Sequence, residues 1–127
     1  MDGERIRVAL VGAGRTGTPL LETLLRHDFV AVDMVADRLE EAPGMVLARA
    51  RGIPTTTDFT RVARLKEPVD IIIEVSGDPG VRAALRLQLQ LQNNRHTIIM
   101  HERIALLMIS MARGELVRGH SGSEDYA

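Results

Sequence analysis

The sequence predicts an α/β domain built on a parallel sheet of about five strands. Short apolar runs rich in β-branched residues alternate along the chain with segments whose apolar residues recur at helical spacing. At 127 residues, with 45% hydrophobic and 26% charged residues, the chain has the size and composition of one globular domain. We expect that domain to cover residues 1–118, followed by a polar, flexible tail over residues 119–127.

The sequence of the first half of the chain predicts a strand, a glycine-rich loop, a helix and a second strand. Ile6 to Val11 is apolar apart from Arg7, which is the pattern of a parallel strand buried on both faces. A helix is expected over residues 16–26, because its leucines recur at helical spacing. Residues 29–36, FVAVDMVA, are apolar and β-branched and predict the second strand.

The second half continues this alternation. Pro43 stands where prolines begin helices, and Gly52 stands where glycines end them. Residues 81–92, VRAALRLQLQLQ, alternate like a strand, but a parallel neighbour to the preceding strand requires a crossover, which is normally helical. The expected elements are a helix over 42–51, a strand over 53–55, a helix capped by Thr57 or Asp58, a strand over 69–75, a helix over 81–92, a strand over 96–100 and a helix over 104–117.

Composition argues against several classes of function. The formal net charge is -1 and aromatic residues make up 2% of the chain, so neither phosphate binding along a basic surface nor base stacking is favoured. The absence of cysteine removes thiolate metal sites and disulfides, and the histidines have no spaced partners for a metal. No apolar stretch is long enough to span a membrane. We therefore expect a cytoplasmic protein with no metal, nucleic-acid or membrane partner.

The loop after the first strand reads Gly12-Ala13-Gly14-Arg15-Thr16-Gly17, a GxGxxG pattern between a predicted strand and a predicted helix. In this context the first glycine permits the tight turn, the second lets the backbone approach a pyrophosphate, and the third lets the helix pack against the sheet. The N–H groups at the helix start favour the anion. The pattern predicts a Rossmann-like, three-layer α/β/α fold with strand order 3-2-1-4-5 and a dinucleotide-binding loop.

The second predicted strand ends at Asp37, 20 residues after Gly17, where a carboxylate can accept hydrogen bonds from the adenosine ribose. Asp37 would repel a 2′-phosphate, whereas the neighbouring Arg38 would attract one, and Arg15 can reach either phosphate group. We favour NAD over NADP because the acid is at the expected place. Asp33, upstream in the same strand, is interpreted as a strand-edge or capping acid.

Polar residues also follow the fourth and fifth strands, at the edge where ligands bind in such sheets. Glu74 interrupts an isoleucine run and needs either a hydrogen-bonding partner or a ligand, because an unpaired buried carboxylate is costly. Ser76, Gly77, Asp78 and Pro79 form either a simple strand-to-helix turn capped by Asp78, or a contact with the nicotinamide half, or both.

His101 and Glu102 are candidates for an acid/base pair. Histidine titrates near neutral pH, and a carboxylate can orient its ring. Adjacent residues of a strand point to opposite faces, however, which argues against a simple pair. The sequence assigns no catalytic residue.

VALVGAGRTG, Asp37 and EVSGDPG together make residues 5–105 resemble the amino-terminal Rossmann domains of homoserine dehydrogenase-like and glucose-fructose oxidoreductase-like enzymes. In these families the segment after strand five commonly supplies a lysine that contributes to catalysis, and a substrate-binding domain follows. Here the segment reads MHERIALL, with Arg103 and no lysine, and one helix follows. Both departures argue against dehydrogenase activity of this chain alone.

A second resemblance is closer and is carried by ADRLEEAPGMVLARARGIPTTTDF and VDIIIEVSGDPGVRAAL together with the apolar last helix. These segments resemble Rossmann-like modules at the amino end of bacterial signalling proteins such as sensor histidine kinases. That resemblance implies a dinucleotide-binding sensory or regulatory domain, since none of the segments is catalytic.

The sequence therefore predicts a module that binds NAD(H) or NADP(H) without turnover of its own, so we lean against enzymatic activity for this chain alone. The first alternative is the cofactor domain of an oxidoreductase that transfers hydride, with its substrate domain missing or on a partner. The second alternative is a degenerate Rossmann domain that serves oligomerisation. The helix from Ile104 to Met111 looks too apolar to stay solvated, so we also predict a homodimer or a docking partner on that helix.

Overall fold

The computed structural model describes residues 4–118, which contain a five-stranded, all-parallel sheet in the order β3-β2-β1-β4-β5. This is the strand order predicted from the sequence. The strands are β1 (Ile6–Val11), β2 (Val30–Ala36), β3 (Thr55–Thr56), β4 (Ile71–Glu74) and β5 (Ile98–His101). The helices are α1 (Gly17–Leu24), α2 (Pro43–Ala50), the 3-10 helix η1 (Phe59–Ala63), α3 (Pro79–Leu91) and α4 (Glu102–Arg113).

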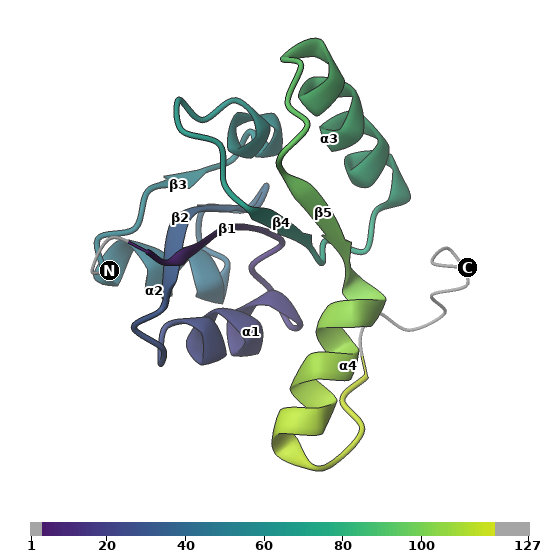
Figure 1. The fold of residues 1–127 in the computed structure, drawn as a ribbon. Coiled ribbons are helices and arrows are strands. Elements are labelled where there is room, and N and C mark those ends of the chain that lie inside the picture. Colours follow the sequence, from purple (N-terminus) through teal and green to yellow (C-terminus); the bar gives the residue numbers. More distant parts are fainter. Residues whose placement is uncertain (1–3, 119–127) are drawn as a thin grey trace.

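Helices cover both faces of the sheet, and each face has its own apolar core (Figure 1). Side chains of a strand alternate between the two faces. Leu10 of β1 is the register partner of Ile73, so Ile72, the neighbour of Ile73 in β4, belongs to the other core. The core containing Leu10 is closed by α1, α2 and α4, and the core containing Ile72 is closed by η1 and α3. The predicted three-layer arrangement is confirmed.

Several element boundaries differ from the sequence prediction, and backbone hydrogen bonds explain the shifts in the strands. The third strand begins at Thr55 rather than residue 53, because the N–H of Ile53 donates to Ala48 O and closes the end of α2. The fifth strand begins at Ile98 rather than residue 96. There the Oδ1 atom of Asn94 accepts the N–H groups of residues 96 and 97 in a turn.

The helices differ in the same way. The segment after Asp58 is one short 3-10 helix, and Asp58 is its cap through a 3.0 Å bond from the N–H of Thr60. The last helix begins at Glu102 rather than residue 104 because the His101 side chain caps it. It ends at Arg113, where Gly114 adopts the left-handed conformation with φ of 73°.

Asp33 lies at an irregularity in the pairing of β1 with β2. Val8 pairs with Val32 and Ala9 pairs with Met34, so Asp33 is the extra residue of a β-bulge. Its Oδ2 atom accepts from the Nε of Arg7 at 2.7 Å and pairs with Nη2 at 2.6 Å. Asp33 is thus a bulge residue of an internal strand that pairs with Arg7, rather than the strand-edge or capping acid that the sequence suggested.

The predicted tail over residues 119–127 lies outside the described residues, and the domain boundary at residue 118 stays a prediction. Within residues 4–118 the structure contains no helix that is long and apolar enough to cross a membrane.

Candidate functional site

The glycine loop leaves β1 in a turn that requires glycine at its first and last positions. Gly12 has a φ of 106°, and an added Cβ would lie 2.8 Å from the carbonyl carbon of Val75. At Gly17 an added Cβ would lie 1.8 Å from the carbonyl oxygen of Gly12, so the start of α1 packs directly on the loop. Two of the three tasks assigned to the glycines, the tight exit and the close helix packing, therefore have a structural basis.

Gly14 differs from the other two glycines of the loop, because no heavy atom lies within 4 Å of an added Cβ. Beside it, the hydroxyl oxygen of Thr16 is buried and has no hydrogen-bond partner among the described residues. Buried polar atoms are rarely left without a partner. An open space along the backbone at a helix start, together with an unsatisfied hydroxyl, suits the pyrophosphate and ribose of a dinucleotide.

Asp37 follows β2 and contacts the glycine loop. Its Oδ2 atom accepts the N–H of Ala13 at 2.8 Å, and its Oδ1 atom accepts the N–H of Leu39 at 2.9 Å. Arg15 and Arg38 are both exposed, and neither side chain forms a hydrogen bond or ion pair with the described residues. The carboxylate therefore stands in a fixed orientation beside the loop.

The carbonyl oxygen of Ala13 also accepts hydrogen bonds, from α1 and from α2. It accepts the N–H of Gly44 at 2.8 Å and the hydroxyl of Thr18 at 2.8 Å. An added Cβ on Gly44 would lie 2.8 Å from the Cβ of Ala13, so the start of α2 touches the loop. Sequence reasoning assigned Pro43-Gly44 to a helix start and missed this contact, although a glycine directly after Pro43 was the available signal.

Glu74 ends β4 and is fully buried. Its Oε2 atom accepts the N–H of Ser76 at 2.9 Å and also the Ser76 hydroxyl, while its Oε1 atom is buried without a hydrogen-bond partner among the described residues. One oxygen thus has the structural partner that the sequence led us to expect. The other oxygen leaves the ligand alternative open.

The turn after β4 passes through Gly77, whose φ is 80°, and ends in α3. Asp78 caps this helix by accepting the N–H of Gly80 at 2.9 Å, and Pro79 is the first residue of the helix. The predicted strand-to-helix turn is present. It lies beside the glycine loop, because a Cβ added at either Gly12 or Gly17 would contact Val75.

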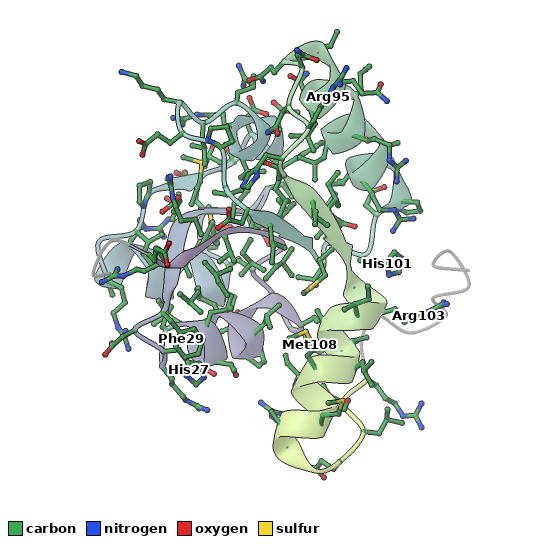
Figure 2. The ribbon with its side chains drawn as sticks, viewed as in Figure 1. His27, Phe29, Arg95, His101, Arg103 and Met108 are labelled. Carbon is green, nitrogen blue, oxygen red and sulfur yellow. The ribbon has the colours of Figure 1, made fainter. Side chains whose placement is uncertain are left out.

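His101 ends β5 and lies at its junction with α4, as Figure 2 shows. Its Nδ1 atom accepts the N–H of Arg103 at 2.9 Å. Burial lowers the pKa of His101 below its ordinary value, and the nearby charge of Arg82 lowers it further. The ring is therefore neutral near neutral pH, and its proton is on Nε2.

His101 is the register partner of Glu74 in the pairing of β4 with β5. Register partners of parallel strands project from the same face of the sheet, whereas Glu102 is the first residue of α4 and is buried. Arg103 is exposed and points away from the sheet in Figure 2. The acid/base role of His101 and Glu102 stays a prediction, and the charge of Glu102 acts on the His101 ring from the start of α4.

A hollow lies at the opposite, amino edge of the sheet. It is an open depression of about 620 Å³ between β2, the end of α2 and the segment before β4. Its acidic walls already pair with Arg7, through Asp33 at 2.6 Å and Glu67 at 3.4 Å. The described residues also hold no group of three side chains suited to a metal ion.

No family model matches the sequence. The chain is 29% identical over 120 residues to the acetaldehyde dehydrogenase of Chloroflexus aurantiacus, an alignment that covers 92% of this chain and 35% of the enzyme. It is 32% identical over 72 residues to acetaldehyde dehydrogenase 2 of Salinispora arenicola, covering 56% of this chain and 24% of that protein. The chain thus spans about a third or less of the length of these relatives.

Solved structures show the same fold. A protein of Bacteroides fragilis described as an NADP oxidoreductase has a TM-score of 0.58 and 25% identity, covering 76% of this chain and 35% of that one. GenD2 from gentamicin A biosynthesis, solved in complex with NAD, has a TM-score of 0.52 and 20% identity, covering 80% of this chain and 35% of that one. The chain therefore has a Rossmann-like α/β fold and resembles part of a dehydrogenase in sequence.

Proposed function

We propose that this chain is a dinucleotide-binding domain that holds NAD or NADP as the cofactor domain of an oxidoreductase. The observation that carries the proposal is the glycine loop, with open space at Gly14 and Asp37 joined to Ala13 at 2.8 Å. The sequence relatives are acetaldehyde dehydrogenases, and one structural neighbour was solved with NAD, which supports the same cofactor class.

In this proposal the backbone N–H groups between Gly14 and Gly17, at the start of α1, hold the pyrophosphate, and Arg15 adds a positive charge at the rim. The carboxylate of Asp37 accepts the hydroxyl groups of the adenosine ribose. The nicotinamide half extends over the ends of β4 and β5, beside the turn from Ser76 to Pro79.

We further propose that NAD is preferred to NADP. Asp37 cannot turn away from a ligand without losing its bonds from the N–H groups of Ala13 and Leu39. A 2′-phosphate at the ribose would therefore meet a fixed negative charge, which is unfavourable at short range. The exposed Arg38 lowers this penalty without removing the carboxylate.

Hydride transfer by a complete enzyme would need a substrate site that the described residues do not display. The exposed Arg103 stands in place of the lysine of the related families, and the chain spans about a third of its dehydrogenase relatives. The proposal therefore assigns cofactor binding to this chain and substrate binding to another domain or partner. The sensory role predicted from the sequence has no counterpart among the relatives named above and stays a prediction.

The outer face of α4 fits such an assembly. Ile104, Leu107, Met108 and Met111 are 49%, 58%, 56% and 70% exposed, and they recur at helical spacing opposite the buried Ala105 and Ile109. We propose that a second copy of the chain or a docking partner covers this stripe, because contiguous exposed apolar residues mark interaction sites.

Amide chemical shifts recorded by NMR during a titration with NAD test the proposed function. The N–H signals of residues 12–17 and 37 should shift first and furthest, because these groups would lie against the dinucleotide. Shifts confined to the depression near Arg7 would place the ligand at the wrong edge of the sheet and would refute the proposal.

A further inference from the structure

Glu74 at the end of β4, His101 at the end of β5 and Arg82 in the first turn of α3 are three polar side chains that we refer to as the edge cluster. Glu74 and His101 are register partners, so their side chains leave the same face of the sheet. That face is the one covered by α3. Ile72 and Ile99, two residues before Glu74 and His101, both pack in the core that α3 closes.

Arg82 completes the edge cluster from the helix side. It shares a face of α3 with Leu85 and Leu89, because residues three and seven positions apart lie on one side of a helix. Both leucines are buried against the sheet. Since α3 starts at the carboxyl edge after β4, its first turn places Arg82 over the strand ends, where its charge acts on His101.

Two atoms of the edge cluster lack partners. The Oε1 atom of Glu74 and the Nη1 atom of Arg82 are both buried, and neither has a hydrogen-bond partner among the described residues. The other carboxylate oxygen of Glu74 is already occupied by Ser76. A buried carboxylate oxygen requires a donor and a buried guanidinium N–H requires an acceptor. A group that carries an N–H or O–H donor beside an acceptor oxygen can satisfy both atoms.

The nicotinamide ring carries such a group, a neutral primary carboxamide. We propose that the edge cluster is the recognition site for this carboxamide, whose NH2 donates to Oε1 of Glu74 while its oxygen accepts from Nη1 of Arg82. The proposal rests on the proposed function, because a dinucleotide bound at the glycine loop extends its nicotinamide half over β4 and β5. It gives Glu74 and Arg82 a role in specificity that differs from pyrophosphate binding.

His101 keeps the charge of the edge cluster balanced. Its Nδ1 atom accepts from the N–H of Arg103, so the ring is held in the neutral form and adds no second cation beside Arg82. A neutral carboxamide between one carboxylate and one guanidinium therefore leaves no net charge in the cluster.

The test is a calorimetric titration of the chain with three ligands: NAD, ADP-ribose and 3-acetylpyridine adenine dinucleotide. NAD carries the complete nicotinamide, ADP-ribose lacks the nicotinamide, and the acetylpyridine analogue lacks only the carboxamide NH2. The natural protein should bind NAD about tenfold more tightly than ADP-ribose. In Glu74→Gln the amide oxygen keeps the bond from Ser76, so the amide NH2 faces the carboxamide NH2. NAD should then bind about tenfold more weakly, whereas ADP-ribose and the acetylpyridine analogue should bind as before.

Arg82→Gln separates the two halves of the proposed contact. It should weaken NAD and the acetylpyridine analogue alike, because both keep the carbonyl oxygen, and it should leave ADP-ribose unchanged. Arg86→Gln, an exposed arginine on the same helix, is the matched control and should change none of the three affinities. Thermal unfolding of each variant verifies that it is folded.

Equal weakening of NAD and ADP-ribose by Glu74→Gln would show that Glu74 only supports the loop, and the carboxamide proposal would be wrong. Unchanged NAD affinity in both variants would also overturn it. In either case binding of ADP-ribose would leave the proposed function intact. If neither NAD nor ADP-ribose binds the natural protein, the proposed function itself fails.

Discussion

The N–H of Ala13 donates to the Oδ2 atom of Asp37 at 2.8 Å, so the end of β2 is tied directly to the glycine loop. The two groups proposed to read the ribose and the pyrophosphate are therefore one structural unit. The carbonyl of Ala13 extends that unit to α2 through the N–H of Gly44. Substitutions that touch any of these contacts should act on dinucleotide binding.

Asp37→Asn should shift cofactor preference toward NADP. The asparagine oxygen still accepts the N–H of Ala13, but the negative charge that opposes a 2′-phosphate is removed. We expect the ratio of the NADPH to NADH dissociation constants to fall by about tenfold, as measured by nucleotide fluorescence. Asp28→Asn, at an exposed turn, is the control. An unchanged ratio would show that Asp37 does not face the ribose.

Gly17→Ala should destabilise the fold, whereas Gly14→Ala should not. The added methyl at Gly17 would lie 1.8 Å from Gly12 O, which forces the helix away from the loop at a cost of about 1–3 kcal/mol. The methyl at Gly14 meets open space. Urea unfolding of both variants measures the difference, and equal stability would contradict the close packing of α1 on the loop.

Gly44→Ala should weaken NADH binding although Gly44 does not face the proposed ligand. Its new methyl would displace Ala13, and the N–H and carbonyl of Ala13 orient the loop. A loss of about tenfold in affinity is expected, as measured by calorimetry. Val46→Ala, at an exposed position of α2, should bind NADH normally. Normal binding by Gly44→Ala would show that the loop tolerates the displacement.

The stability of the domain should decrease in acid through Asp70. Its pKa is lowered because the carboxylate accepts the N–H of Arg7 at 2.8 Å and contacts Nε2 of His96 at 2.6 Å. A lowered pKa in the folded state means that stability is present above the unfolded value of about 3.9 and is lost as the pH falls through the folded value. Urea midpoints recorded against pH should therefore vary less in Asp70→Asn, and an identical profile would contradict this assignment.

Met108→Lys should dissociate any assembly formed through the outer face of α4. A lysine at the centre of the stripe cannot be buried against an apolar partner without a large desolvation cost. Light scattering coupled to size-exclusion chromatography should show a dimer for the natural protein and a monomer for the variant. Gln90→Lys on α3 is the control. If the natural protein is monomeric at high concentration, a second copy of the chain does not cover the outer face of α4.

The order of the strands, the glycine loop and the position of Asp37 were predictable because they depend on local patterns. Apolar runs identify the strands, and the Rossmann-like pattern of the first strand, glycine loop and helix predicts their order. The GxGxxG spacing places the loop. These features require no knowledge of which distant residues meet.

The contacts that complete the site were not predictable, because they join segments far apart in the sequence. Gly44 reaches Ala13 only after α2 has packed beside the loop, and Glu74 meets His101 only through the register of β4 with β5. The pairing of His101 with Glu102 was considered because the two residues are adjacent. The side chain of His101 caps α4, which explains why that helix starts earlier than its apolar pattern predicts.

Calorimetric titration of NADH into the natural protein and into Gly14→Val tests the central claim most directly. Gly14 has an ordinary backbone conformation and open space beside it, so the valine should leave the melting temperature nearly unchanged while filling the space proposed for the pyrophosphate. Ala50→Val at the exposed end of α2 is the control. The account predicts binding by the natural protein and the control but none by folded Gly14→Val, and equal binding by all three would contradict it.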